Sequence, residues 1–390
     1  MCVTRKSTVS PPLSSSHKSH QLDEEQRIAR TCGWFSVKYF EPVTLSGDQT
    51  RYIFVNASKY GIVWGNVSFF LIMHVLFAYA VYCLVVSCDR HPLWIVCYVV
   101  GLFGGLGVTA GAHRLWSHKT YNASLAVRLF LMMCFTSAGE NDIYTWSRDH
   151  RLHHKFTETD ADPHNSRRGG FFAHVGWLLT RKHPDVILKG TSIDNSDLIS
   201  DPVVNYNRQY YILLYLFFRV YLSIMIPHWI LNETLFNSSI GMSLCAQTFF
   251  GITSIFAGCF ASYVAQLHTV WFVNSAAHIF GDRPYNNKIQ PRENWWVAIT
   301  GMGEGFHNYH HTFPWDYTIA ENGLSYWNPA KWFIDAMFRL GLCSNLKRPS
   351  TDLVEKTLSR VKQTPMQEKE FYVHNHPYSQ PHGYTDGAEQ

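Results

Sequence analysis

The sequence predicts an all-α integral membrane protein, in which four transmembrane helices carry a cytosolic helical cap that is rich in histidine. Two observations predict this fold class. Apolar residues gather in four long runs, and two of these, Pro92–His113 and Thr234–Gly281, contain no Asp, Glu, Lys or Arg. Eight histidines gather in three short clusters. A bilayer core needs about 20 apolar helical residues, so each run is long enough to cross it.

The first 60 residues predict a flexible cytosolic arm. This segment is rich in Ser, Pro and charged residues at its start, and it lacks the basic start and apolar core of a cleaved signal peptide. The main membrane domain then covers residues 61–345, and its first apolar run would itself direct insertion.

We place the four spans at about residues 67–88, 94–112, 210–231 and 243–265. The third contains Arg219, which costs a few kcal/mol in a bilayer unless it faces a cavity or reaches the surface. Leu125–Ala138 is apolar but too short to cross, so an interfacial or re-entrant helix is expected there. Buried helices of a soluble protein are the alternative, but four runs with such apolar centres are rare in one soluble fold.

Positive charge sets the orientation of the spans. Of the 33 Lys and Arg residues, all but Arg90 and Arg219 lie before the first span, between the second and third, or after the fourth. The positive-inside rule therefore places both termini and the middle segment in the cytosol.

Two further segments are expected after the last span, a surface helix and a disordered tail. Trp332, Phe333, Ala336, Met337 and Leu340 recur at helical spacing, which indicates a helix on the membrane surface over residues 329–342. Residues 346–390 are polar and charged, and we expect them to form a disordered tail.

The histidine clusters predict metal binding. His150, His153 and His154 have the spacing i, i+3 and i+4, which is one face of a helix, and His307, His310 and His311 repeat it. His113 and His118 are five residues apart, about 140° on a straight helix, so a shared ion would require the helix to end or distort between them. Imidazole suits iron, zinc, copper and nickel, and the eight histidines predict more than one ion without identifying the element.

Other residues point toward the same region. Asn274 and His278 lie four residues apart on the cytosolic extension of the last run, and they add a carboxamide and a ninth imidazole. His268 is on this stretch too, but it has no partner at ligand spacing and is assigned to packing. Glu158, Asp160 and Asp162 follow the central cluster, where carboxylates typically orient imidazoles through the other ring N–H.

The segments that carry these histidines resemble the membrane-bound acyl-CoA desaturases, in particular the stearoyl-CoA, delta-9 type and its insect relatives. The resemblance covers roughly residues 60–345. The matching motifs are residues 113–118, 146–156, 160–165, 274–278 and 303–311.

The resemblance implies a non-haem centre of two iron ions (Fe²⁺). One iron would be held by His113, His118, His150, His154 and His310, and the other by His153, His278, His307 and His311, with Asn274 reaching it through water.

The resemblance also implies the substrates and partners. The enzyme would use O₂ to introduce a double bond into a fatty acyl-CoA in the endoplasmic reticulum membrane, and no nucleic acid is expected to bind. The coenzyme A head group would meet Asn66, Asn141, Arg148, Asp149, Arg181 and Lys182, and the acyl chain would pass Trp146 and Trp271. An ordinary positive-inside excess is the alternative for the basic residues. The chain contains no His-Pro-Gly-Gly haem signature, so electrons would come from separate cytochrome b5 and its NADH-dependent reductase.

Two features depart from the family pattern. The resemblance implies that the acyl chain enters a bent tunnel between the spans. Glu140 stands where relatives commonly carry glutamine, and it could alter the polarity of this tunnel or be protonated. Gly101, Gly104 and Gly105 leave a patch without side chains on the second span. That patch would widen the tunnel, or it would serve close helix packing.

Two other functions fit some of these features. A fatty acyl hydroxylase or acetylenase on the same scaffold would be told apart by its product. A polytopic receptor or transporter with a structural zinc belongs to a different class, but nine convergent histidines favour redox iron. The sequence leaves acyl chain length, double-bond position and geometry, and oligomeric state open.

Overall fold

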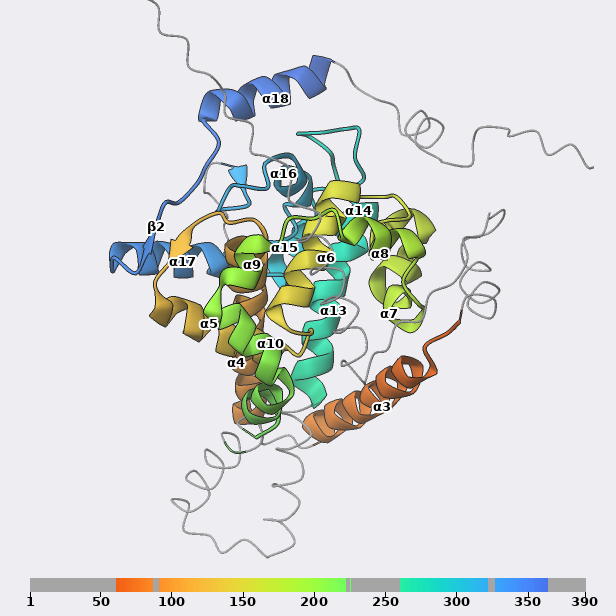
Figure 1. The fold of residues 1–390 in the computed structure, drawn as a ribbon. Coiled ribbons are helices and arrows are strands. Elements are labelled where there is room, and N and C mark those ends of the chain that lie inside the picture. Colours follow the sequence, from red (N-terminus) through yellow and green to blue (C-terminus); the bar gives the residue numbers. More distant parts are fainter. Residues whose placement is uncertain (1–60, 87–90, 222–224, 226–259, 322–326, 364–390) are drawn as a thin grey trace, which may run out of the picture.

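The computed structural model describes residues 61–86, 91–221, 225, 260–321 and 327–363 (Figure 1). These residues are mainly helical, and the one named sheet pairs β1 (Asn122–Ala123) with β2 (Cys343–Ser344) in antiparallel register. The predicted arm 1–60 and most of the predicted fourth span lie outside the described residues. The prediction of a helical protein with a histidine-rich centre is confirmed.

Helix α3 (Trp64–Val86) coincides with the first predicted span. Within it, Trp64–Tyr82 is the one segment of the described chain that is long and apolar enough to cross a membrane. Leu71, Ile72 and Val75 are exposed, as lipid-facing side chains would be. Figure 1 shows α3 as a separate rod beside the main helical body. A backbone hydrogen bond from Val63 N to Leu179 O (2.9 Å) connects the start of α3 to that body.

Helix α4 (His91–Leu106) runs without a break into the π-helix η1 (Gly107–Ser117), so one continuous rod contains the second predicted span. Glycines let this rod approach its neighbours. A Cβ on Gly104 would lie 2.5 Å from Gln266 Oε1, and one on Gly105 would lie 2.7 Å from Met302 Sδ. Close packing, the alternative given above, therefore explains these two glycines. Gly101 has nothing within 4 Å of such a Cβ.

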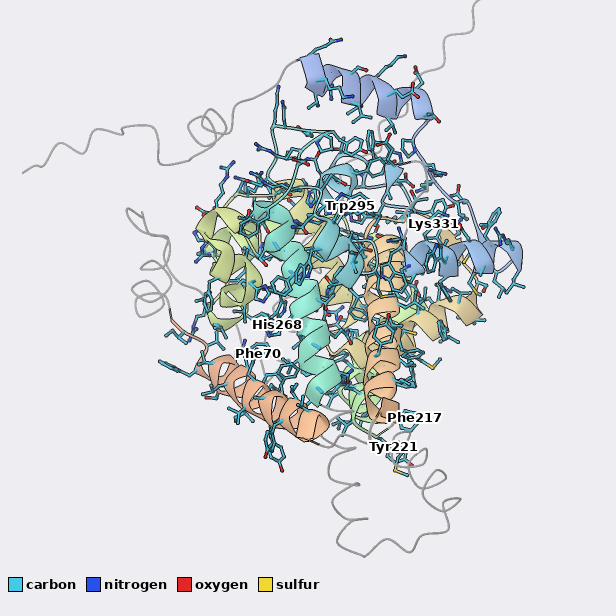
Figure 2. The ribbon with its side chains drawn as sticks, turned by 180° about the vertical axis from the view of Figure 1, so that it is seen from behind. Phe70, Phe217, Tyr221, His268, Trp295 and Lys331 are labelled. Carbon is cyan, nitrogen blue, oxygen red and sulfur yellow. The ribbon has the colours of Figure 1, made fainter. Side chains whose placement is uncertain are left out.

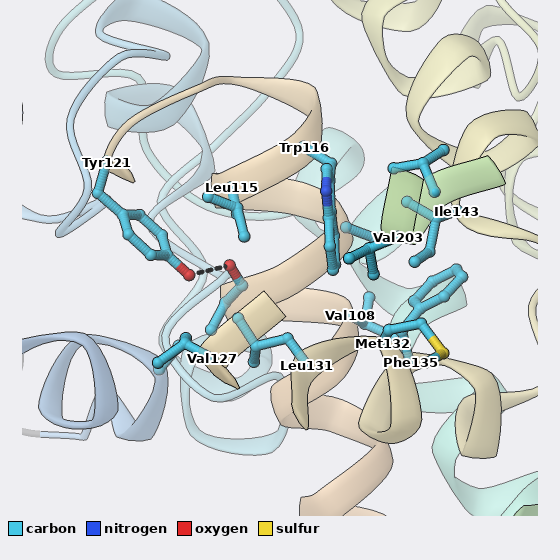
Figure 3. Close-up of a cluster of buried hydrophobic side chains, with 14 of the residues drawn as sticks. Val108, Leu115, Trp116, Tyr121, Val127, Leu131, Met132, Phe135, Ile143 and Val203 are labelled. Atoms are coloured by element: carbon cyan, nitrogen blue, oxygen red, sulfur yellow. Dashed lines mark hydrogen bonds between the residues drawn. The ribbon is translucent and has the colours of Figure 1, made fainter. Parts of the chain in front are cut away.

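Helix α5 (Leu125–Ala138) has the predicted bounds and packs against η1. It begins at Ser124, whose hydroxyl accepts from Val127 N, and ends at Gly139, whose φ of +74° favours glycine. Between α5 and η1 lies the main apolar core (Figure 3), which includes Val108, Leu115, Trp116, Tyr121, Val127, Leu131, Met132, Phe135, Ile143 and Val203. Each fully buried apolar side chain of this size contributes about 1.5–3 kcal/mol, so this contact fixes η1 in place.

Arg219 lies on η4 (Leu216–Tyr221), the short π-helical continuation of α10 (Pro202–Tyr215). Its side chain is 1% exposed and donates to Ser137 O (3.3 Å) and to Ser262 Oγ (2.9 Å). Arg219 therefore faces protein, which removes the cost that a lipid-facing charge would carry.

The cap is assembled from short helices around α6 (Ile143–Phe156) and α13 (Ser262–Asn274) (Figure 1). The others are η2 (Ser166–Arg168), η3 (Phe172–Gly176), α7 (Trp177–Leu179), α8 (Pro184–Gly190), α9 (Ser196–Ser200), α14 (Ala276–Ile279), α15 (Trp295–Thr300), α16 (His307–Thr312), α17 (Pro329–Arg339) and α18 (Thr351–Gln363). Helix α17 falls within the surface helix predicted for residues 329–342, and it exposes Trp332 and Phe338.

The prediction of a disordered tail is wrong for α18. Val354 of this helix is buried in a cluster with Tyr285, Tyr309 and Phe313 of the cap. The sequence analysis missed the helix because few of its residues are apolar, and the contacts that stabilise it come from distant parts of the chain.

Candidate metal centre

Two helices present histidines on one face, as their spacing predicts. Helix α6 begins at Asp142, whose carboxylate accepts from Thr145 N (3.0 Å), and it places His150, His153 and His154 along one side. The face of α16 carries His307, His310 and His311.

Helix α16 begins without a capping side chain of its own. Glu293 Oε1 instead accepts from Tyr309 N (2.7 Å), a first-turn donor that no helical carbonyl can reach.

His113 and His118 come together because η1 is a π-helix. The backbone bond from His118 N to His113 O (3.1 Å) spans five residues, so the two side chains lie on the same side of the helix, with their ring planes at 75° to each other. Their ring centroids are 5.0 Å apart. This is the distortion that a shared metal ion was expected to require.

Nine histidines converge in two groups. The first contains His113, His118, His150, His154 and His310, and the second contains His153, His278, His307 and His311. In each group one ring nitrogen of every histidine lies within 4.8 Å of the others. The resemblance assigned these same two sets to two irons, and we treat metal ligation as a proposal below.

The contacts inside each group are between Nε2 atoms. His310 Nε2 lies 2.9 Å from both His113 Nε2 and His154 Nε2, and His118 Nε2 lies 2.9 Å from His150 Nε2. In the second group the distances are 3.0 Å from His278 to His307, 3.2 Å from His307 to His311 and 3.3 Å from His153 to His311.

Hydrogen bonds cannot account for all of these contacts. Nε2 of a neutral His310 carries either one hydrogen or one lone pair, so it can form a good hydrogen bond with only one of its two neighbours. A metal ion at about 2.0–2.1 Å from each nitrogen would hold its ligands about 3 Å apart. The residues present therefore fit a metal ion in each group.

Carboxylates favour the tautomer with a hydrogen on Nδ1 in two of the imidazoles. Glu304 Oε2 lies 2.8 Å from His113 Nδ1, and its other oxygen accepts from Arg114 (2.9 Å). Asp162 Oδ1 lies 2.9 Å from His153 Nδ1. A hydrogen on Nδ1 leaves Nε2 free to bind a metal ion.

Of the three predicted carboxylates, Asp162 contacts a clustered imidazole as expected. Glu158 is buried, and its Oε1 lies 4.0 Å from His278 Nδ1. Asp160 is exposed. The sequence analysis gave Glu304 and Arg114 no role. The one signal for Glu304 was its place three residues before His307.

Burial sets the charge state of the centre. It lowers the pKa of seven clustered histidines well below the usual value, and nearby imidazoles add to the effect; these are His118, His150, His154, His278, His307, His310 and His311. Burial opposes ionisation of Glu304, but His113 and Arg114 outweigh it and lower the pKa of that carboxyl. Neutral imidazoles beside ionised carboxylates are suited to divalent cations.

The predicted head-group residues are partly brought together. Asp149 on α6 accepts from Arg148 (2.8 Å) and from Lys182. Burial opposes ionisation of Asp149, but the Lys182 ammonium and the Arg148 guanidinium outweigh it and lower its pKa to about 2. Arg148, Asp149 and Lys182 form a charged group, and its two cations lie at the surface of the cap.

The other residues predicted to bind the head group or the metal are dispersed around this charged group. Asn66 donates to Leu178 O (2.7 Å), and Arg181 N donates to Gly61 O (3.3 Å) at the base of α3. Asn141 is exposed between α5 and α6, and Asn274 is the last residue of α13.

Two tryptophans were predicted to lie beside an acyl chain. Trp146 stacks on His150 with ring centroids 5.0 Å apart, and its Nε1 donates to Glu140 Oε2 (3.1 Å). Burial raises the pKa of Glu140 to about 8, so that carboxyl is mostly protonated at neutral pH. Trp271 is 2% exposed on α13.

The metal-free protein is expected to lose stability as pH falls. Imidazoles titrate near pH 6.5 in the unfolded chain, whereas in the folded chain the seven named above remain neutral well below that pH. Below about pH 6.5 the unfolded state therefore binds more protons, which favours unfolding. Thermal unfolding in detergent at about pH 7.5 and about pH 5.5 tests this, and equal midpoints would contradict it.

Comparison with known proteins relates these motifs to one family. The family model described as fatty acid desaturase matches residues 89–333. The chain is 46% identical to stearoyl-CoA desaturase 5 of Homo sapiens over 304 residues, which cover 78% of this chain and 86% of that protein. It is 43% identical to acyl-CoA Delta-9 desaturase of Acheta domesticus over 300 residues, which cover 77% and 79% of the two chains.

Proposed function

The chain belongs to the fatty acid desaturase family, and we propose on this basis that it is an oxidoreductase that introduces a double bond into the acyl chain of a fatty acyl-CoA. The relatives reported above carry the names stearoyl-CoA desaturase and acyl-CoA Delta-9 desaturase, and a delta-9 position is the expectation for this chain. The convergence of nine imidazoles in two groups is the observation that carries the proposal.

The two groups would hold two iron ions, with five histidines on one and four on the other. Asn274 would reach the second ion through water. Iron, when bound, supplies an oxidant strong enough to remove hydrogen from an unactivated methylene, which no side chain can do, with O₂ as the co-substrate. The protein's own part is to keep the imidazoles neutral, to fix their tautomers through Glu304 and Asp162, and to exclude water.

The coenzyme A head group would bind near Arg148, Asp149 and Lys182. The two cations suit phosphate recognition, and Asp149 holds both in place. Asn66, Asn141 and Arg181 would complete this surface. Because Trp146 stacks on a clustered histidine, an acyl chain that passes its indole would reach the metal ions.

We place the protein in the endoplasmic reticulum membrane with four spans and both termini in the cytosol. The charge distribution along the chain supports this orientation, and α3 supports the first span. Electrons would come from membrane cytochrome b5 and its NADH-dependent reductase.

The donor is tested with purified protein. The protein with acyl-CoA, O₂ and NADH is expected to give no product until cytochrome b5 and the reductase are added. Turnover with NADH alone would contradict the need for a separate donor.

Expression in a yeast that lacks its own desaturase tests the proposed function. The wild-type protein is expected to produce monounsaturated fatty acids, whose double bonds are located by mass spectrometry after derivatisation. A hydroxylated or acetylenic product would indicate the sister chemistries, and the absence of any new product would contradict a desaturase.

Gly101→Tyr in the same yeast is expected to shift products toward shorter acyl chains. The structure leaves open space where a Gly101 side chain would begin, and we expect a tyrosine there to shorten the acyl tunnel that the family resemblance implies. The double-bond position counted from the carboxyl end should stay fixed, because the distance from head group to metal ions does not change. Gly65→Tyr on α3 is a control, since a Cβ at Gly65 also meets nothing within 4 Å. An unchanged chain-length profile in Gly101→Tyr would contradict the prediction.

A further inference from the structure

A third set of imidazoles lies apart from the two metal groups. It contains His74 of α3, His174 of η3 and His268 of α13, and we refer to these three as the imidazole array. His268 Nε2 lies 3.0 Å from His74 Nε2, and His268 Nδ1 lies 2.9 Å from His174 Nε2. His268 is therefore more than a packing residue, since it joins rings that are 194 and 94 residues away in the sequence. In Figure 2, the labels His268 and Phe70 mark the two long helices that this array connects.

Both ends of the array are fixed by oxygen atoms. His74 Nδ1 lies 2.6 Å from Phe70 O, which can only accept, so that nitrogen must carry a hydrogen. At the other end, His174 Nδ1 lies 2.9 Å from Ser275 Oγ, and the same hydroxyl lies 2.8 Å from Trp271 O.

A count of the available hydrogens shows which group donates and which accepts in each contact of the array. It contains four contacts, and one hydrogen on each of the three rings supplies only three of the hydrogens that these contacts need. Burial and the neighbouring His268 lower the pKa of His174 to about 4, so His174 does not supply another at neutral pH. The fourth hydrogen must come from the Ser275 hydroxyl when it turns from Trp271 O to His174. All four contacts are then hydrogen bonds. Each group donates to the next, from Ser275 to His174, to His268, to His74 and finally to Phe70 O.

Ser275 stands at a break in the helix that presents two of the proposed metal residues. Helix α13 ends at Asn274, Ser275 has φ −108° and ψ −70°, and α14 begins at Ala276. The carbonyl of Ser275 accepts from His278 N (3.1 Å). The position of Ser275 therefore sets where His278, a member of the four-histidine group, points.

The array also encloses Trp271. The indole lies 5.1 Å from the His268 ring, 5.6 Å from the His174 ring and 6.5 Å from the His74 ring, measured between centroids. Phe70 closes a further side at 5.4 Å. One set of contacts thus connects α3, η3 and α13 around the residues that precede His278.

We propose that His268, His174 and His74 are positioning residues, and that their hydrogen-bonded array with Ser275 fixes the break between α13 and α14 and thereby holds His278 in the four-histidine group. This inference rests on the proposed function, because it assumes that the group binds a metal ion. It assigns the array no contact with substrate or metal.

The release of iron from the purified, iron-loaded protein to a chelator tests the inference. Residues that orient a metal ligand typically change metal affinity by about 10–100-fold, so His268→Phe is expected to release one of its two iron ions at least about tenfold faster than wild type. The other ion should leave at the wild-type rate, because the five-histidine group is untouched. His268→Gln can donate to His74 and accept from His174, and it is expected to restore slow release.

Thr269→Val is the matched control. Thr269 is the next residue of α13, and its hydroxyl bonds only within its own helix, to Ala265 O (3.0 Å). Release should stay at the wild-type rate. Ser275→Ala should speed release as His268→Phe does, and the double variant should be no faster than the faster single variant, because residues of one network are not additive.

The outcomes separate this inference from the function on which it rests. Wild-type release in His268→Phe, or equally fast release in His268→Phe and His268→Gln, would overturn the positioning role while the wild type still binds iron and desaturates. If His268→Phe fails to fold, Ser275→Ala decides the question by the same measurement. A wild-type protein that binds no iron would instead contradict the proposed function.

Discussion

His310→Ala is expected to reduce desaturation below detection and to remove iron from the five-histidine group. His310 is fully buried, and its Nε2 lies 2.9 Å from the Nε2 atoms of both His113 and His154, so it joins imidazoles from η1 and α6. Mutation of a residue that only orients a metal ligand typically lowers metal affinity or activity about 10–100-fold. Removal of a ligand itself should therefore lower activity more than about 100-fold.

Metal content and product formation are measured on the same purified variant. His376→Ala removes a histidine of the C-terminal tail that belongs to none of the sequence clusters, and it should keep wild-type values. The His310→Ala protein should still insert into the membrane, because α3 and the α4–η1 rod are unchanged. Wild-type iron content and activity in His310→Ala would remove His310 from the metal centre.

Glu304→Gln is expected to weaken iron binding about 10–100-fold and, because it removes the charged partner of the buried Arg114, to destabilise the fold by about 3–5 kcal/mol. Glu304 accepts from both His113 and the fully buried Arg114, so its charge stabilises the His113 tautomer and the guanidinium together. A glutamine keeps the shape but loses the charge. Glu304→Ala removes the hydrogen-bond acceptors as well, so it should destabilise the fold further.

A chelator titration measures iron affinity, and thermal unfolding measures stability. Asp335→Asn offers a control, since Asp335 pairs with Lys331 on the surface helix α17 and lies outside both histidine groups. The account of the tautomer would be contradicted if Glu304→Gln held iron as tightly as wild type.

Local periodicity allowed much of the site to be predicted. The faces of α6 and α16 follow from histidine spacing alone, because residues three and four apart are neighbours on any α-helix. The bounds of α5 also agree with the prediction, since its apolar run, its capping serine and its terminal glycine are consecutive in the sequence.

Long-range contacts could not be predicted in the same way. Glu304 meets Arg114 across 190 residues, and nothing near either residue signals the pairing. The π-helical turn that joins His113 to His118 was predicted only as a distortion, because its geometry depends on packing against α5. His268 was assigned to packing for the same reason, since its partners lie on other helices.

The metal content of the purified wild-type protein, determined together with its product from stearoyl-CoA, tests the central claim most directly. The protein is supplied with cytochrome b5, its reductase, NADH and O₂, and metals are quantified by mass spectrometry. The account predicts about two iron ions per chain and a monounsaturated acyl-CoA whose formation requires O₂. A single zinc ion with no oxidised product would contradict it and would favour the receptor or transporter alternative.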